Sequence, residues 1–168
     1  MSSPTLRALL QPRPLNGWML ALCAALLAGA YLLEYGFGLE PCSLCILQRI
    51  ALFGCALFAA VPLVLNPARP LRRACAAGVL VCADVGALLA FRQLWLQQLP
   101  PEQVPACMPS LDYLVEVMPL MDALMLALRG DGNCAEVAWR FLGLTLPGWA
   151  AVGFLGLITL SLVQLVRR

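Results

Sequence analysis

Four apolar stretches, each long enough to cross a lipid bilayer, constrain this chain more than any other feature of its sequence. A membrane-spanning helix needs about 20 predominantly apolar residues. The chain is 62% hydrophobic and only 12% charged, which is too apolar for a soluble domain of 168 residues. The sequence therefore predicts an all-α membrane protein, a single domain over residues 1–168 built as a bundle of four transmembrane helices. These are expected at about residues 16–34, 45–65, 72–94 and 145–166.

A fifth apolar stretch, residues 111–128, is interrupted by Pro119 and carries three acids, Asp112, Glu116 and Asp122. An acid near the centre of a membrane helix costs about 2.5 to 3.5 kcal/mol, and three of them outweigh the gain from the apolar residues. We therefore expect one or two short amphipathic helices that lie along the membrane surface.

The distribution of arginines predicts the orientation of the bundle. Seven of the eleven lie in the N-terminus, the second-to-third connection and the C-terminus, which contain no acid. By the positive-inside rule, both termini are expected in the cytoplasm. Two loops, at about residues 35–44 and 95–144, are then expected on the opposite side of the membrane.

The eight cysteines divide by their expected depth. Four lie within the predicted spans, where a thiol packs as a small hydrophobic group; they are Cys23, Cys55, Cys75 and Cys82. The other four lie in the external loops, where disulfides persist if the compartment is oxidising; they are Cys42, Cys45, Cys107 and Cys134. A zinc site is disfavoured because the second pair lacks the short spacing of a zinc knuckle. Structural disulfides and redox-active pairs remain as alternatives.

The Cys42-Ser-Leu-Cys45 pair has the features of a redox centre. A disulfide that closes so short a loop contributes little to stability. Pro41 suits the first turn of a helix, so both sulfurs are expected at a helix N-terminus, where the dipole favours a thiolate. Arg49, four residues after Cys45, lies on the same helical face and is expected to favour that thiolate further.

The second pair of loop cysteines has a different setting. Cys107 lies in "PACMPS" and Cys134 in "GDGNCAEV", both rich in turn-forming residues. A disulfide in such a loop would be accessible to another protein. One exposed redox pair and one at the membrane surface beside a cation form the layout of an electron relay.

These motifs together resemble the DsbB family of bacterial inner-membrane quinone reductases, which reoxidise the periplasmic dithiol oxidase DsbA. The resemblance covers almost the whole chain, including "EPCSLCILQRIALFG" after the first span and "GNCAEVAWRFLGLTLPGW" before the fourth. It implies that Cys107 forms a mixed disulfide with a DsbA-like thioredoxin-fold oxidase and that Cys134 is its disulfide partner. Cys42 would then accept electrons from Cys134, leaving Cys45 to face the quinone.

The resemblance also implies a cofactor, partners and a location. The electron acceptor is expected to be ubiquinone or menaquinone from the membrane pool, bound with the help of Arg49, without a metal or a flavin. The expected protein is a multi-pass, monomeric inner-membrane protein with periplasmic redox loops, and no nucleic acid partner is expected. Some relatives carry a histidine near the quinone, and this chain has none, so Arg92 and Gln93 are the remaining candidates for that position.

Two alternatives stand beside this hypothesis. A quinone-linked reductase of the vitamin K epoxide type also uses a CxxC pair on four helices, although there the pair lies late in the chain. A membrane scaffold held by two structural disulfides would be no enzyme at all.

Overall fold

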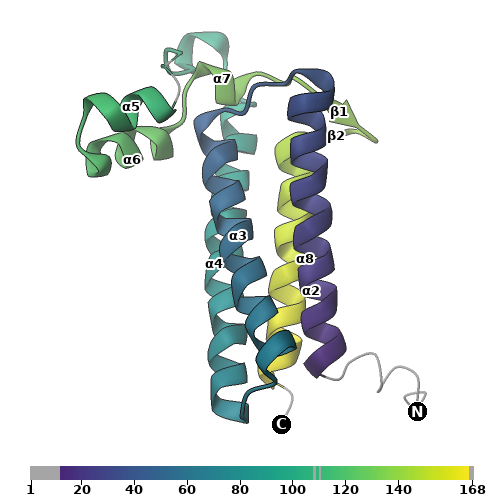
Figure 1. The fold of residues 1–168 in the computed structure, drawn as a ribbon. Coiled ribbons are helices and arrows are strands. Elements are labelled where there is room, and N and C mark those ends of the chain that lie inside the picture. Colours follow the sequence, from purple (N-terminus) through teal and green to yellow (C-terminus); the bar gives the residue numbers. More distant parts are fainter. Residues whose placement is uncertain (1–11, 108, 110, 167–168) are drawn as a thin grey trace.

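The structure is a computed structural model that describes residues 12–107, 109 and 111–166. Four long helices form a bundle (Figure 1), and each is long and apolar enough to cross a membrane. They are α2 (Pro12–Tyr31), α3 (Ser43–Leu65), α4 (Arg69–Leu96) and α8 (Leu146–Val166). The predicted fold class, a helical membrane bundle, is confirmed.

The connections between the helices divide between the two ends of the bundle. Figure 1 places the start of α2, the α3–α4 connection and the last turn of α8 together at one end. At the other end α2 continues into a π-helical segment, η1 (Leu32–Gly36), before a short loop leads to α3. This loop turns at Gly38, whose φ of +68° favours glycine. The two cysteine-bearing connections therefore share one end of the bundle.

The core of the bundle consists of small and medium apolar side chains with one large ring, Phe154 of α8. A Cβ atom added at Gly86 of α4 would lie only 2.1 Å from that ring. Glycine at this position lets the two helices approach closely, as small residues do in membrane helix interfaces. A second buried cluster at the outer end contains Leu44, Leu89, Leu96 and Cys134 and attaches the long loop to the bundle.

The long loop carries its own short elements. It contains η2 (Pro101–Gln103), α5 (Leu111–Val117), α6 (Leu120–Arg129) and α7 (Gly132–Ala135). The stretch expected to form one or two amphipathic helices thus forms two, α5 and α6, which lie beside the outer end of the bundle in Figure 1. Apolar side chains of α6 are exposed, namely Leu120, Met121, Leu124, Met125 and Leu128.

A small hairpin, which the sequence did not predict, precedes α8. Strands β1 (Arg140–Phe141) and β2 (Leu144–Thr145) pair antiparallel. The turn between them places Leu142 and Gly143 at positive φ. The hairpin positions its aromatic residues beside the start of α8, where the indole N–H of Trp149 donates to the carbonyl of Phe141 at 3.1 Å.

Candidate functional site

The CxxC pair lies at the first turn of α3. Cys42 is the N-cap residue, with extended backbone (φ −71°, ψ 168°), and its carbonyl accepts a hydrogen bond from the N–H of Ile46. Cys45 lies one turn further along the helix. The Cys42 thiol donates toward Cys45 Sγ at 3.1 Å, so the two sulfurs are adjacent in their reduced form. Cys45 is thereby the hydrogen-bond acceptor of the pair.

Two buried glutamine side chains lie against this pair. Gln93 of α4 places its amide nitrogen 3.3 Å from Cys42 Sγ and 3.4 Å from Cys45 Sγ. Gln48 of α3 donates from its own amide nitrogen to Gln93 Oε1 at 2.8 Å. Sequence reasoning named Gln93 only as a candidate quinone contact and missed Gln48. The spacing of Gln48, three residues after Cys45, was the available signal.

Cys134 is fully buried in α7, beside the start of α3. Asp131 caps α7 by accepting a hydrogen bond from the Cys134 backbone N–H at 3.0 Å. Ser43 Oγ lies 3.6 Å from Cys134 Sγ. Cys42 packs against the buried cluster that contains Cys134, and each of the two thiols shifts the pKa of the other. The structure therefore brings a cysteine of the long loop against the first cysteine of the CxxC pair.

The pKa values of these two thiols are shifted in opposite directions. The pKa of Cys134 is lowered, chiefly by the hydrogen bond with Cys42, and further by the backbone N–H groups of Asp131 and Leu44. The pKa of Cys42 is raised by its hydrogen bonds with Cys134 and Cys45 and by burial. The part of this shift that comes from Cys42 exists only while Cys42 is a thiol. The backbone N–H donors to Cys134 remain when Cys42 is bonded to Cys45, and they favour the thiolate, which is the attacking form in disulfide exchange.

Cys107 is exposed, unlike the other three loop cysteines. It lies in an open groove of about 430 Å³ whose lining includes Leu96, Val104 and Gly132. A Cβ atom added at Gly132 would be 2.7 Å from Cys107 Sγ, so the thiol rests directly against the backbone of α7. The groove places the Cys107 sulfur within reach of an external protein and next to the helix that carries Cys134.

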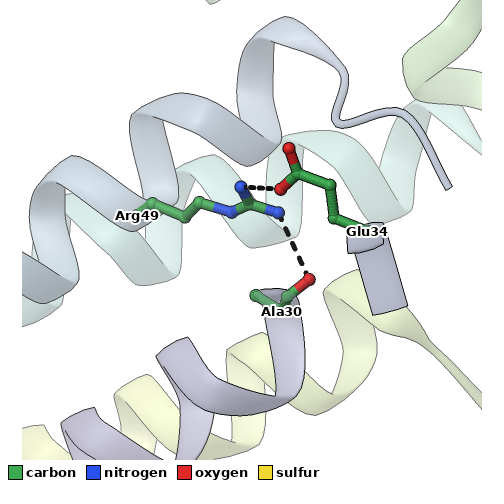
Figure 2. Close-up of polar contacts among 3 residues, drawn as sticks. All are labelled: Ala30, Glu34 and Arg49. Carbon is green, nitrogen blue, oxygen red and sulfur yellow. Dashed lines mark hydrogen bonds and ion pairs between the residues drawn. The ribbon is translucent and has the colours of Figure 1, made fainter. Parts of the chain in front are cut away.

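Arg49 points from α3 toward the end of the first span (Figure 2). Its guanidinium forms an ion pair with Glu34 and donates to the carbonyl of Ala30 at 3.4 Å. Its Cζ atom also lies 4.8 Å from the centre of the Tyr31 ring. The sequence does not identify Glu34, the last residue of the first expected span (16–34), as a partner of Arg49. Two features of the sequence could have indicated this ion pair. Glu34 lies near the end of one span, and Arg49 lies near the start of the next.

A cavity of about 260 Å³ lies beside Cys45, between α2, α3, the hairpin and the start of α8. Its wall is mainly apolar and includes Gly29, Leu33, Leu52 and Trp149. Polar groups of Cys45, Gln48, Arg49 and Gln93 line one part of it. A flat, apolar ring with polar oxygens at its edge matches this combination of surfaces, so the residues present fit a quinone.

Arg92 lies elsewhere. Its guanidinium donates to the carbonyl of Arg129 at 3.1 Å and stacks over Trp95 with 4.5 Å between Cζ and the ring centre. It does not line the cavity beside Cys45. Of the residues singled out from the sequence, the structure brings together Cys42, Cys45, Arg49 and Gln93 around one pocket, and Cys134 lies beside the start of the same helix. Cys107 lies against the backbone of α7, and Arg92 lies apart.

Comparisons with known proteins agree on one family. A family model described as disulfide bond formation protein DsbB matches residues 12–164. Disulfide bond formation protein B of Marinobacter nauticus is 48% identical over 152 residues, 90% of either chain. The relative from Stutzerimonas stutzeri is 43% identical over 86% of this chain and 89% of its own. Disulfide bond formation protein B 1 of Pseudomonas aeruginosa is 37% identical over 95% of this chain and 98% of its own.

Proposed function

Because the chain belongs to the DsbB family of membrane protein-disulfide oxidoreductases, which reoxidise DsbA, we propose that it works through a two-disulfide relay. Electrons pass from a DsbA-like partner to Cys107–Cys134, then to Cys42–Cys45, and leave to a membrane quinone. The observation that carries this proposal is the position of the Cys134 thiol, buried against Cys42 and Ser43 at the start of α3.

The first exchange takes place in the groove at Cys107. A thiolate of the partner attacks Cys107 Sγ, the Cys107–Cys134 bond breaks, and its electron pair remains on Cys134. The exposure of Cys107 and the backbone N–H donors from Asp131 and Leu44 to Cys134 support this direction, because an accessible sulfur is attacked and a stabilised thiolate leaves.

The second exchange takes place at the membrane surface. The Cys134 thiolate attacks Cys42 Sγ, a Cys42–Cys134 bond forms, and the electron pair of the broken Cys42–Cys45 bond remains on Cys45. When both mixed disulfides are resolved by the remaining thiols, the partner is a disulfide and the CxxC pair is reduced. Two electrons and two protons have then moved to Cys42 and Cys45.

The cavity beside Cys45 is proposed as the quinone site, lined by Arg49, Gln93, Leu33 and Trp149. A bound quinone would supply the acceptor for the two electrons and two protons. The DsbA disulfide lies at about −120 mV, far more oxidising than an ordinary structural disulfide below about −300 mV. An ordinary protein disulfide is too reducing to accept these electrons, so the relay needs a stronger oxidant as its final acceptor. Arg49 presents a cation at the wall, and the apolar residues exclude water.

The loops that carry these cysteines are proposed to face the periplasm, with both termini in the cytoplasm. The grouping of both cysteine-bearing connections at one end of the bundle supports this topology (Figure 1). Arginines at the starts of α2 and α4, at the opposite end, support it too; they are Arg13, Arg69, Arg72 and Arg73.

Replacement of Cys45 tests the proposed order of the relay. In the Cys45→Ala protein, reduced DsbA should still form a mixed disulfide at Cys107, and Cys42 should be recovered linked to Cys134. Quinone reduction, followed by absorbance, should be lost. The matched control is Cys82→Ala, which removes a thiol from within the spans and should leave turnover unchanged. Quinone reduction by Cys45→Ala at the parent rate would overturn the relay.

A further inference from the structure

A single side-chain amide lies against both sulfurs of the CxxC pair. The amide nitrogen of Gln93 is 3.3 Å from Cys42 Sγ and 3.4 Å from Cys45 Sγ. The residue is only 4% exposed. A side-chain amide carries two N–H donors on its nitrogen, so this one group can donate to each sulfur.

Gln48 fixes which end of that amide faces the sulfurs. Its Nε2 donates to Gln93 Oε1 at 2.8 Å, and Gln48 is itself only 6% exposed. The carbonyl oxygen of Gln93 accepts this hydrogen bond, and the Cys45 thiol also donates toward it over a longer distance, 3.7 Å. The amino end lies closer to both sulfurs. Because polar groups buried in apolar surroundings are costly without partners, the two amides hold each other in this orientation.

From this geometry we infer that Gln93 is a catalytic residue that stabilises the thiolate released at Cys45, and that Gln48 is the residue that positions its amide. The inference rests on the proposed relay for the identity of the leaving sulfur. When Cys134 attacks Cys42 Sγ, the Cys42–Cys45 bond breaks and its electron pair remains on Cys45. An N–H donor already aimed at that sulfur meets the charge as it develops and needs no rearrangement.

The low polarity of the surroundings makes this contact strong. Hydrogen bonds to an ionised group are about twice as strong as neutral ones, and a low local dielectric strengthens them further. Hydrogen bonds to charged groups typically stabilise the charged state enough to change an equilibrium constant roughly 10- to 100-fold. The equilibrium concerned here is reduction of the Cys42–Cys45 disulfide, which creates the thiolate. Loss of the Gln93 donors should therefore disfavour the reduced, thiolate-bearing form of the pair.

A matched control exists in the same bundle. Gln164 of α8 is also 6% exposed, and its amide has no hydrogen-bond partner among the described residues. It lies near the end of α8 that is opposite the cysteine-bearing loops. Replacing Gln164 removes a buried amide of the same kind without touching the CxxC pair.

The experiment measures the reduction potential of the Cys42–Cys45 pair alone. The full chain carrying Cys107→Ala and Cys134→Ala, purified without quinone, is equilibrated in glutathione redox buffers from pH 6 to pH 9. The reduced fraction is then trapped with a maleimide reagent. Because neither DsbA nor quinone takes part, failure of the proposed relay would not alter this measurement.

Gln93→Met should lower the exchange equilibrium constant about 10- to 100-fold, which at 29.6 mV per tenfold is about 30 to 60 mV toward a more reducing potential. The shift should grow with pH as the reduced form ionises, whereas a purely structural effect would be the same at every pH. Gln48→Glu offers only acceptors when ionised and turns the Gln93 carbonyl toward the sulfurs, so it should shift the potential further than Gln48→Met.

The inference is overturned if Gln93→Met and Gln48→Glu both keep the parent potential across the pH range, or if Gln164→Met shifts it equally. Thermal unfolding of each protein reports whether the bundle is intact. Should Gln93→Met fail to fold, the comparison of Gln48→Glu with Gln48→Met decides, because both retain Gln93.

Discussion

The ion pair between Arg49 and Glu34 offers the sharpest test of how the cavity is built. In Glu34→Gln the carboxylate that holds the guanidinium is replaced by a neutral amide of nearly the same shape. The side chains of Arg49 and Glu34 are 14% and 21% exposed, so solvent screens the pair only partly. A hydrogen bond to a charged group contributes about 1.5 to 3 kcal/mol, and partial exposure reduces this to about 1 to 2 kcal/mol.

Loss of that energy should be visible in quinone binding, because Arg49 forms part of the cavity wall. A change of about 1 to 2 kcal/mol corresponds to roughly a 5- to 30-fold increase in KM for a short-chain quinone. Disulfide exchange with reduced DsbA should keep its rate, since Glu34 has no contact with Cys107 or Cys134 among the described hydrogen bonds and ion pairs.

A double-mutant cycle decides whether the effect passes through Arg49. The energies of Glu34→Gln and Arg49→Met should not add in the double variant, because each already removes the same contact. Glu40→Gln makes the same chemical change at an exposed acid nearby and should leave KM unchanged. Additive effects of the two substitutions, or an equal effect of Glu40→Gln, would refute the reasoning.

Three further predictions follow from the geometry. In the reduced protein, the hydrogen bond with Cys42 is the main cause of the lowered pKa of Cys134, so Cys42→Ala should raise that pKa. Alkylation of Cys134 should then slow at neutral pH and recover at high pH. An unchanged pH profile would contradict this. Gly86→Ala places a Cβ atom against the Phe154 ring and should destabilise the bundle by about 1 to 3 kcal/mol in thermal unfolding; no loss of stability would show that the helices can separate freely. Gly29→Leu, whose Cβ meets nothing within 4 Å, should fill the cavity and reduce quinone turnover at least tenfold while exchange with DsbA continues; Gly17→Leu, also in open space on α2, is its control, and equal losses in both would remove the cavity from the quinone site.

Most of the fold could be predicted from the sequence, because a long apolar stretch that crosses a membrane must satisfy its backbone hydrogen bonds internally, as a helix does. It also locates the CxxC pair at a helix start, since Pro41 and the apolar run after Cys45 mark where α3 begins. The hairpin before α8 could not be foreseen in the same way. Its strands have two residues each, which is too short for an alternating pattern to appear.

The site was only partly predictable, for a physical reason. Which side chains meet Arg49 depends on how α2 is rotated about its axis, and a nearly continuous apolar sequence does not specify that rotation. The sequence therefore places Glu34 only at the end of the first span, and the structure shows that it meets Arg49. Gln48 similarly looked like an ordinary polar residue, since its role depends on Gln93 in a different helix.

The contacts at the outer end of the bundle also bear on the rate of the proposed exchange. Cys134 receives backbone N–H donors from Asp131 and Leu44, and Cys45 receives the Gln93 amide. These donors remain in place when Cys42 is bonded in a disulfide and has no proton of its own to donate. Donors are thus already present at the attacking sulfur and at the leaving sulfur before the exchange begins. An arrangement of this kind should speed transfer from Cys134 to Cys45, because the donors need not move as the charge passes from one sulfur to the other.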